Sequence, residues 1–182
     1  MRTSYLNWED YLKLINSLNG NKFRLLIALQ GMCGLRISDA LNLTWNDILN
    51  TNEVKLKEKK TGKERTIYFN STLMAIIQEE YKDQNGSVFV FRSKFCNKPM
   101  SLEYVNRQLK EIFCKFDVEY NQRVSSHLFR KTFGRRYMEI NKYSDKALLM
   151  LNEVFGHSTI AITKIYLGIN EDEKKNVYLN LV

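Results

Sequence analysis

The sequence predicts a mainly helical domain with one small antiparallel β-sheet, which is an α+β fold. Apolar residues recur at the spacing of an amphipathic helix through most of the chain, and many of these runs follow a side chain that can cap a helix. Between residues 53 and 69 the spacing changes to an alternation of apolar and polar residues around a Thr-Gly turn, which is typical of a β-hairpin. At 182 residues, the chain has the length of one domain with its own core.

The N-terminal part is expected to hold three helices. The first follows Asn7, which can cap a helix that has Asp10 at its third position. The second is expected from about residue 22 to residue 33 and to end at Gly34, because glycine readily adopts the left-handed conformation that terminates helices. A short third helix, capped by Ser38, is expected to follow directly.

The predicted hairpin carries a local excess of positive charge. Residues 55 to 65 hold six lysine or arginine side chains and two glutamates. A charged hairpin often serves only as a solvated edge that discourages aggregation. The excess here surrounds the turn, however, where a projecting lysine can also reach a ligand.

The rest of the chain is predicted to be helical apart from a short apolar strand at 88–91. The predicted helices begin at Asn70 or Ser71, Ser101, about His127, Ser144 and Ser158. The helix after Ser144 is expected to end at Gly156, and the helix after Ser158 is expected to reach Tyr166.

Composition and charge narrow the classes of function. The formal net charge of +8 and the pI of about 9.3 favour a polyanionic partner, with nucleic acid as the first candidate.

The three cysteines, Cys33, Cys96 and Cys114, have neither the spacing of a disulfide framework nor a histidine at a metal-ligand spacing, so we expect no metal site. No apolar run is long enough to span a bilayer and no secretory leader opens the chain, so we expect a cytoplasmic protein without a membrane segment.

Two segments near the C-terminus hold residues suited to chemistry on a phosphate. The segment SSHLFRKTFGRRY places His127 and Arg130 three residues apart, on one face of a predicted helix. The segment FGHSTIAITKIYL places His157 directly after a glycine helix stop and Tyr166 nine residues later. Together these side chains can form a phosphate clamp with a phenol aimed at it. Taken singly, His127 is better explained as a core or capping histidine, and Arg130 as one charge among many on a solvated face.

Arg36 lies in the segment GLRISDAL, in the connection between two predicted helices. It can be a solvated residue or a donor to the last carbonyls of the preceding helix. Its apolar neighbours Leu35 and Ile37 suggest instead a stem held between core side chains, which would fix the guanidinium in space. Asp39, three residues later, can stabilise the N-terminus of the next helix.

These segments together resemble the catalytic domain of the tyrosine recombinases, the phage integrase family. The resemblance rests on GLRISDAL with Arg36, EKKTGKERTIYF with Lys60, HLFR with His127 and Arg130, and GHSTIAITKIY with His157 and Tyr166. It implies that residues 1–182 are a single catalytic domain with the fold class given above. The separate N-terminal core-binding DNA domain that is usual in the family would be absent, so the chain would be either a piece of a longer protein or a short recombinase.

The reaction that the resemblance implies is the cleavage and rejoining of DNA strands at a specific site through a 3′-phosphotyrosyl intermediate, without metal, ATP or another cofactor. Tyr166 would be the nucleophile. Arg36 and Arg130 would hold the nonbridging phosphate oxygens by bidentate hydrogen bonds, because negative charge builds on these oxygens in the transition state. Losing one such preorganised donor typically costs about 10² to 10³ in rate.

The resemblance assigns proton transfer and support to the other residues. A free phenol has a pKa near 10, so only about 0.1% is phenolate at neutral pH, and His127 is the candidate base for the Tyr166 proton. Lys60, on the turn of the predicted hairpin, would protonate the leaving 5′ oxygen. His157 would add hydrogen bonds to the phosphate, and Asp39 would orient the cations of the site.

The implied partners are double-stranded DNA with inverted-repeat core sites and further copies of the chain. We expect a monomer in free solution and a tetramer on DNA, held together by residues 171–182. Asn170 and Glu173 predict a capping box at the start of this segment, and an apolar run follows.

Two other functions stay open. A type IB topoisomerase has the same clamp and tyrosine but relaxes supercoils, and the short spacing from His157 to Tyr166 favours the recombinase. A catalytically idle DNA-binding regulator would be indicated by the loss of a catalytic residue, and all the residues of the four motifs are present.

Overall fold

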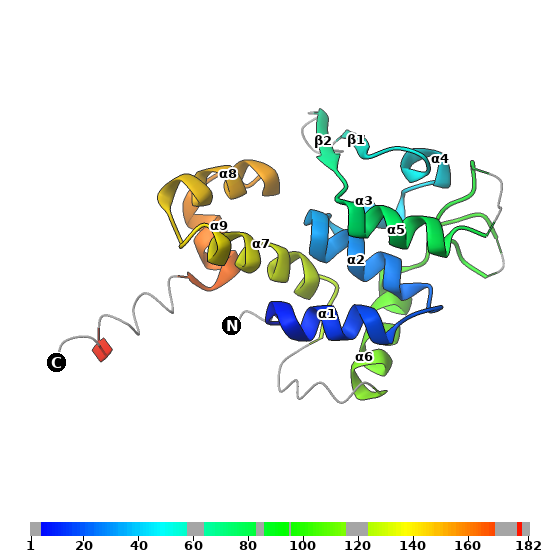
Figure 1. Cartoon of the computed structure of the whole chain (residues 1–182), viewed down its shortest axis with the longest axis horizontal. Coiled ribbons are helices and arrows are strands. Elements are labelled where there is room, and N and C mark those ends of the chain that lie inside the picture. Colours follow the sequence, from blue (N-terminus) through cyan, green and yellow to red (C-terminus); the bar gives the residue numbers. More distant parts are fainter. Residues whose placement is uncertain are drawn as a thin grey trace.

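The structure of the protein is a computed structural model that describes residues 5–57, 64–82, 86–94, 96–115, 124–169 and 178–179. Figure 1 shows how its elements are arranged. In chain order they are α1 (Trp8–Ser17), α2 (Phe23–Cys33), α3 (Ile37–Leu41), α4 (Trp45–Ile48), β1 (Glu53–Lys57), β2 (Glu64–Tyr68), α5 (Ser71–Glu80), α6 (Leu102–Lys115), α7 (Leu128–Ile140), α8 (Asp145–Phe155) and α9 (Ile160–Leu167). The predicted fold class, mainly α with one small antiparallel sheet, is confirmed.

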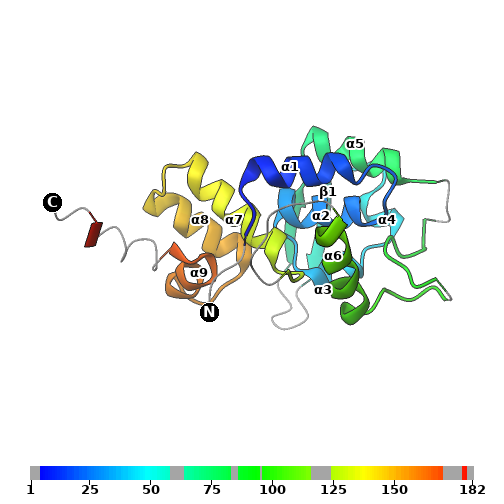
Figure 2. The same ribbon diagram turned by 90° about the horizontal axis from the view of Figure 1, so that it is seen from below.

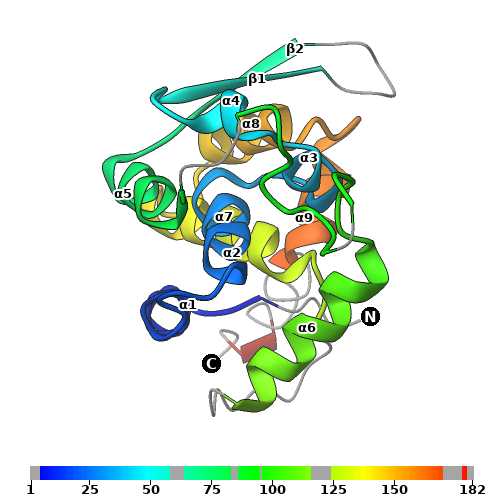
Figure 3. The same ribbon diagram turned by 90° about the vertical axis from the view of Figure 1, so that its right-hand side faces the viewer.

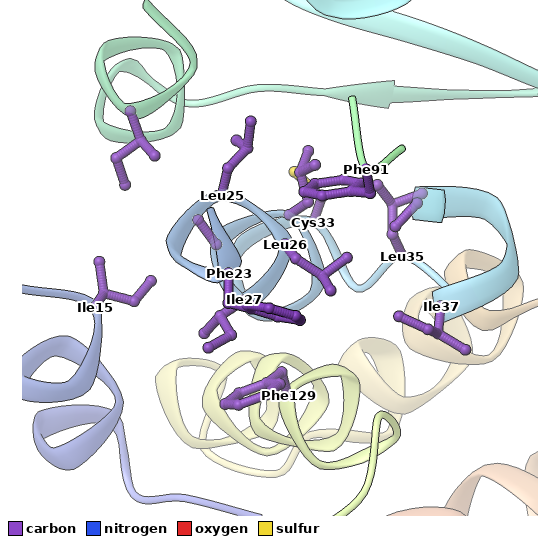
Figure 4. Packing of buried hydrophobic residues seen from close by; sticks show 14 of the residues in the cluster. Ile15, Phe23, Leu25, Leu26, Ile27, Cys33, Leu35, Ile37, Phe91 and Phe129 are labelled. Atoms are coloured by element: carbon purple, nitrogen blue, oxygen red, sulfur yellow. The ribbon is translucent and has the colours of Figure 1, made fainter. Parts of the chain in front are cut away.

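Helix α2 lies at the centre of the larger of two hydrophobic clusters in the described chain. Nearly all its residues are buried, because α7 and α5 pack along it and α1 lies against it. Phe129 of α7 points toward the side of α2 that carries Ile27 (Figure 4). The helix ends at Gly34 with φ of 63°, as predicted, and a Cβ there would also lie 2.6 Å from a ring carbon of Phe133 on α7. Glycine is therefore required both for conformation and for space.

Helix α7 extends out of this core into a second, smaller cluster that it forms with α8 and α9. Its buried members are Met138, Ala147, Leu148, Leu151, Phe155, Leu167 and Ile169. At Gly134 a Cβ would lie 2.7 Å from Leu167 and 2.9 Å from Phe155, so the absence of a side chain lets the helices approach closely. Figures 1 and 2 show α8 and α9 at one end of the molecule and α1 to α6 at the other, with α7 joining them.

Strands β1 and β2 form the one sheet of the described chain. They pair antiparallel, with Glu53 opposite Tyr68 and Lys57 opposite Glu64. The hairpin lies across one side of the helical body, above α3 and α4 in Figure 3. The predicted turn with Lys60 falls in residues 58–63, which lie outside the described residues.

Most predicted helix starts are confirmed, because capping depends on side chains that are close in the sequence. Asn7 accepts a hydrogen bond from the backbone N–H of Asp10, at 2.8 Å. The side chains of Asn70, Ser101 and Ser144 accept in the same way at the starts of α5, α6 and α8.

Three predictions of local structure are wrong. Helix α3 begins after Arg36, so Ser38 lies inside its first turn and does not cap it. Thr159, rather than Ser158, caps α9 by accepting from the N–H of Ile162. The apolar run 88–91 forms no strand, because only isolated bridges, such as the one between Thr44 and Phe89, give it β-type partners.

One described helix has no counterpart among the predicted ones. The short helix α4 is held by a capping box between Thr44 and Asp47. This local signal lies within the segment NLTWNDI and was not used in the prediction.

No helix in the described ranges combines the length and the apolar character that crossing a bilayer requires. The three cysteines are free thiols, and Cys33 is buried.

Candidate active site

Arg130, in the first turn of α7, is the most enclosed cation of the candidate site, with 3% of its surface exposed. Its guanidinium donates to the carbonyl oxygen of Gly34 at the end of α2 and, at 3.0 Å, to that of Phe155 at the end of α8. It also lies 4.3 Å from the centre of the Phe155 ring. Burial lowers the pKa of Arg130 to about 10, so the side chain stays protonated at neutral pH.

Arg36 reaches the same carbonyl from another element. It is the residue before α3, and its Nη2 donates to the Phe155 oxygen at 2.8 Å. The side chain is half-buried between the buried residues Leu35 and Ile37, as one of the two sequence interpretations proposed. The last carbonyls of a helix carry partial negative charge, so the end of α8 brings the two arginines together.

Tyr166, on α9, lies beside these arginines and between the two histidines of the chain. Its ring centre is 5.3 Å from that of His157, 6.4 Å from that of His127 and 5.5 Å from that of Phe155. The hydroxyl oxygen is buried and lies close to the Arg130 guanidinium, although no described group meets both the distance and the angle of a regular hydrogen bond to it. Burial raises the pKa of Tyr166, while Arg130 and then Arg36 act to lower it. In the absence of DNA, the phenol is therefore protonated at neutral pH.

His127 lies directly before α7, where its side chain makes no capping hydrogen bond. The residue is exposed at one side, but partial burial of its ring lowers its pKa, and the nearby charges of Lys131 and Arg130 lower the pKa further. A neutral imidazole beside the Tyr166 ring can accept a proton. The position thus suits the predicted base, and the structure gives no support to a capping role.

His157 follows Gly156, whose left-handed conformation ends α8 as predicted. Burial lowers the pKa of His157 to about 4, and Arg130 and Arg36 contribute to the decrease. Its Nδ1 lies 2.9 Å from the Oγ1 of Thr163 on α9. The ring is therefore neutral near pH 7 and is tied to the helix that carries Tyr166.

Asp39 makes an ion pair with Arg65. From the sequence, Arg65 was expected only to add to the positive charge of the hairpin. Arg65 Nη2 lies 3.1 Å from Asp39 Oδ2, and its Nη1 donates to the Val154 oxygen at 2.8 Å. Asp39 also lies in the first turn of α3, so the helix-stabilising interpretation holds as well. The burial pattern of β2 places Arg65 on the same inward-facing side as Ile67. Arg65 could have been identified from the sequence, because it is a charged residue at a strand position whose side chain faces inward.

Other residues of the site were also missed. Lys131 Nζ lies 5.0 Å from the centre of the Tyr166 ring. Thr163 is fully buried and contacts both His157 and Asn152. Lys131 could have been identified from its position next to Arg130 in the segment HLFRKT. The sequence contains no comparable signal for Thr163 or Asn152.

The structure thus brings together five of the six predicted catalytic residues, Arg36, His127, Arg130, His157 and Tyr166. The sixth, Lys60, lies outside the described residues. Arg36, Asp39 and His157 also line an open cavity of about 1100 Å³ between the hairpin, α3 and the end of α8. The described residues hold no cluster of three or more side chains suited to a metal ion.

Comparison with known proteins decides the family. The model of the phage integrase family matches residues 5–173. The chain belongs to the phage integrase family. One relative of this integrase-family chain is the probable integrase/recombinase YoeC of Bacillus subtilis (strain 168), which is 32% identical over 162 residues. The alignment covers 88% of this chain and 86% of YoeC.

Other relatives of the integrase-family chain are longer. The tyrosine recombinase XerS of Streptococcus pyogenes serotype M1 is 28% identical over an alignment 192 positions long, gaps included, which covers 97% of this chain and 52% of XerS. The chain therefore spans about half the length of this relative.

Solved structures agree on the fold. The XerA recombinase superposes with a TM-score of 0.74 at 17% identity, covering 99% of this chain and 65% of XerA. The catalytic domain of bacteriophage HP1 integrase superposes with a TM-score of 0.64 at 20% identity, covering 98% of this chain and 96% of that domain. The integrase-family chain thus has the fold of a tyrosine recombinase catalytic domain.

Proposed function

We propose that this protein is a tyrosine-type site-specific recombinase that cleaves and rejoins DNA strands through a 3′-phosphotyrosyl bond to Tyr166. One observation carries the proposal. The Tyr166 phenol lies between two histidines and beside two arginines that are anchored on one carbonyl oxygen. The relatives named integrase or tyrosine recombinase support the same function.

The arginines would stabilise charge on the phosphate. A guanidinium has five N–H donors, so donation to a helix end is compatible with donation to phosphate oxygens. Because Arg130 is held by the ends of two helices and the Phe155 ring, its orientation is set before DNA binds. Such preorganisation is what makes hydrogen-bond donors effective in a transition state.

The proton transfers would involve His127 and Lys60. In the cleavage step, the Tyr166 oxygen forms a bond to phosphorus and its proton passes to His127, which is neutral at pH 7. The bond from phosphorus to the 5′ oxygen breaks, and Lys60 supplies the proton that this oxygen needs. In the rejoining step a 5′ hydroxyl attacks the phosphotyrosyl bond, which regenerates the phenol without an external energy source.

The partner would be double-stranded DNA with inverted-repeat core sites. The net charge of +8 suits a polyanion, and related structures support DNA as the ligand: the XerH recombinase, for example, was solved bound to a palindromic difH substrate. We expect this protein to act on DNA in the cytoplasm.

Association into a tetramer on DNA is part of the proposal. Helices α8 and α9 expose six apolar side chains: Leu149, Met150, Val154, Ile160, Ile162 and Ile165. We infer that residues 171–182 of a neighbouring copy cover such a surface. Of this segment, the structure describes Tyr178 and Leu179, whose side chains are 78% and 64% exposed.

Trapping of a covalent complex tests the function. A nicked suicide duplex that carries the cognate core site loses a short fragment on cleavage, so the enzyme stays attached through the 3′ phosphate. We expect an SDS-resistant adduct with the unaltered protein and none with Tyr166→Phe, which removes one oxygen and keeps the shape of the side chain. Noncovalent affinity for the same duplex, measured at low ionic strength, should be nearly unchanged.

Tyr137→Phe is the matched control, because Tyr137 lies on α7 and belongs to the same hydrophobic cluster as Tyr166. This variant should form the adduct. Peptide mapping of the adduct to Tyr137, Tyr178 or another tyrosine would reject Tyr166 as the nucleophile. An adduct that persists in Tyr166→Phe would reject it as well.

A further inference from the structure

Asn152, His157 and Thr163 form a closed set of hydrogen bonds at the junction of α8 and α9. The Asn152 Nδ2 lies 3.1 Å from the backbone oxygen of His157. The Thr163 Oγ1 lies 2.8 Å from Asn152 Oδ1 and 2.9 Å from His157 Nδ1. Thr163 is fully buried, so water does not compete for these contacts.

The direction of each hydrogen bond follows from what its atoms can do. A backbone carbonyl only accepts, so the Asn152 atom that faces the His157 oxygen is the amide nitrogen. The Asn152 atom that faces Thr163 is then the amide oxygen, which also only accepts. Thr163 therefore gives its single hydroxyl hydrogen to Asn152 and can only accept from His157, so the hydrogen must lie on Nδ1.

The state of the other ring nitrogen follows from the surroundings. Arg130 of α7 and Arg36 before α3 face His157 and lower its pKa together with burial, and the phenol of Tyr166 on α9 packs against the ring. The neutral ring carries one hydrogen, and Thr163 holds it on Nδ1. Nε2 is then a hydrogen-bond acceptor in the unbound protein.

We propose that Asn152 and Thr163 are positioning residues that fix His157 in the Nδ1–H tautomer and so make Nε2 the nitrogen that acts in the reaction. This inference rests on the proposed function. Nε2 then presents a lone pair in the unbound protein, so His157 must gain a proton there before it can give a phosphate oxygen the hydrogen bond that the resemblance assigns to it. A bound phosphate beside Nε2 favours that gain, because its negative charge stabilises the imidazolium. Without the Thr163 hydroxyl, the neutral ring can carry its hydrogen on either nitrogen and loses the contact that orients it, so Nε2 is no longer delivered to the phosphate from a fixed position.

The tautomer can be observed directly in the free protein by ¹⁵N NMR of the imidazole rings. The chain has two histidines, so the signals of a His127→Gln variant assign those of His157. We expect the His157 Nδ1 to be protonated and Nε2 to be unprotonated near neutral pH. In Thr163→Val, which keeps the shape but removes the hydroxyl, we expect a mixture of tautomers, and Thr163→Ser should restore the single form.

Thr132→Val is the matched control. Thr132 is also a buried threonine, 1% exposed, whose hydroxyl accepts from Leu6 and donates to Leu128. This variant loses comparable buried hydrogen bonds, so it should lose stability without a change in the His157 tautomer. A hydrogen on Nε2 in the unaltered protein, or an unchanged spectrum in Thr163→Val, would overturn the inference.

Cleavage of the suicide duplex gives the second readout. The rate in Thr163→Val should fall by about tenfold to a hundredfold, as is typical when a supporting residue is lost, with the affinity for the duplex nearly unchanged. Thr163→Ser should cleave close to the rate of the unaltered protein. Equal rates for Thr163→Val and the unaltered protein would show that the tautomer does not matter to the reaction. The NMR measurement needs no DNA, so it can fail while Tyr166 still forms an adduct, or succeed while no adduct forms.

Discussion

Arg130 is a charged side chain in a nearly closed position, which is costly unless its N–H groups are satisfied. Its partners are carbonyl oxygens at the ends of α2 and α8. Carbonyls satisfy the donors but carry only partial charge, so the positive charge is less neutralised than it would be in an ion pair with a carboxylate. The residue is therefore both fixed in orientation and still attractive to a phosphate.

His157 makes stability depend on pH. Its pKa is lowered to about 4, below the value of about 6.5 that the unfolded chain retains, so the folded state binds fewer protons between these values. The free energy of unfolding should therefore fall as the pH falls through this window. Urea unfolding near neutral pH and about pH 5 should show a smaller decrease in His157→Gln than in the unaltered protein. An equal decrease in both proteins would contradict the lowered pKa.

Lys60 is predicted to be the general acid for the leaving 5′ oxygen. Lys60→Ala should slow cleavage of ordinary DNA by about 10² to 10⁴, the usual contribution of general acid catalysis. A duplex with sulfur at the bridging 5′ position should restore most of the rate, because a thiolate leaves without protonation. Equal defects on both substrates would assign the proton to another group.

At the scale of elements, the C-terminal end of α8 organises the cations of the site. Its last two carbonyls accept hydrogen bonds from Arg36, Arg65 and Arg130, which come from the start of α3, from β2 and from α7. Helix α8 is itself fixed by the Ser144 cap at one end and by Gly156 at the other. A rigid helix end thus provides a common anchor for three segments that are far apart in the sequence.

The ion pair between Arg65 and Asp39 should support this arrangement. In Arg65→Met we expect cleavage to slow by about tenfold to a hundredfold with little change in DNA affinity, because the hairpin is no longer held to α3 and α8. Asp39→Asn should have a similar effect, and the double variant should be little worse than either single one. Single-turnover cleavage rates with a separate binding assay would measure this.

Arg24→Met is the control for the Arg65 experiment. Arg24 pairs with Glu79, away from the site, and its side chain is 11% exposed compared with 18% for Arg65. Thermal unfolding should show a loss of stability in both variants, while cleavage should slow only in Arg65→Met. Equal slowing in both would mean that the effect is general destabilisation.

At the scale of the whole molecule, α7 joins a large core around α2 to a smaller cluster with α8 and α9. The predicted catalytic residues of the described chain lie where these two parts meet, since Arg36 comes from one part and His157 and Tyr166 from the other. Figure 2 shows α7 passing from one part to the other. Relative movement of the two parts would therefore separate the clamp from the nucleophile.

Deletion of residues 171–182 tests the proposed association. The deletion should weaken assembly on paired sites, because the apolar side chains of this segment would no longer cover a neighbouring copy. Sedimentation velocity on duplexes carrying two core sites would measure the assembly, and circular dichroism would check the fold of the shortened chain. Unchanged sedimentation would mean that the segment packs within its own copy.

The sequence by itself determined most of the helices and the hairpin, and its resemblance to the phage integrase family named the candidate catalytic residues. Helix starts at Asn7, Asn70, Ser101 and Ser144 depend on contacts within a few residues, so the local sequence contains the information. The segment 88–91 shows the limit of this argument, because an apolar run becomes a strand only if another strand pairs with it along its length. That pairing is a property of the fold.

Only the tertiary structure decided how the candidate residues act together. Arg36 and Arg130 meet on the carbonyl of Phe155, a backbone atom that every residue has, so no sequence pattern could single it out. The partners of Asp39 and His157, which are Arg65 and Thr163, became visible only when β2 and α9 were placed beside α3 and α8. The physical reason is that orientation, burial and charge at a site depend on groups distant in the sequence, whereas capping and periodicity depend on near ones.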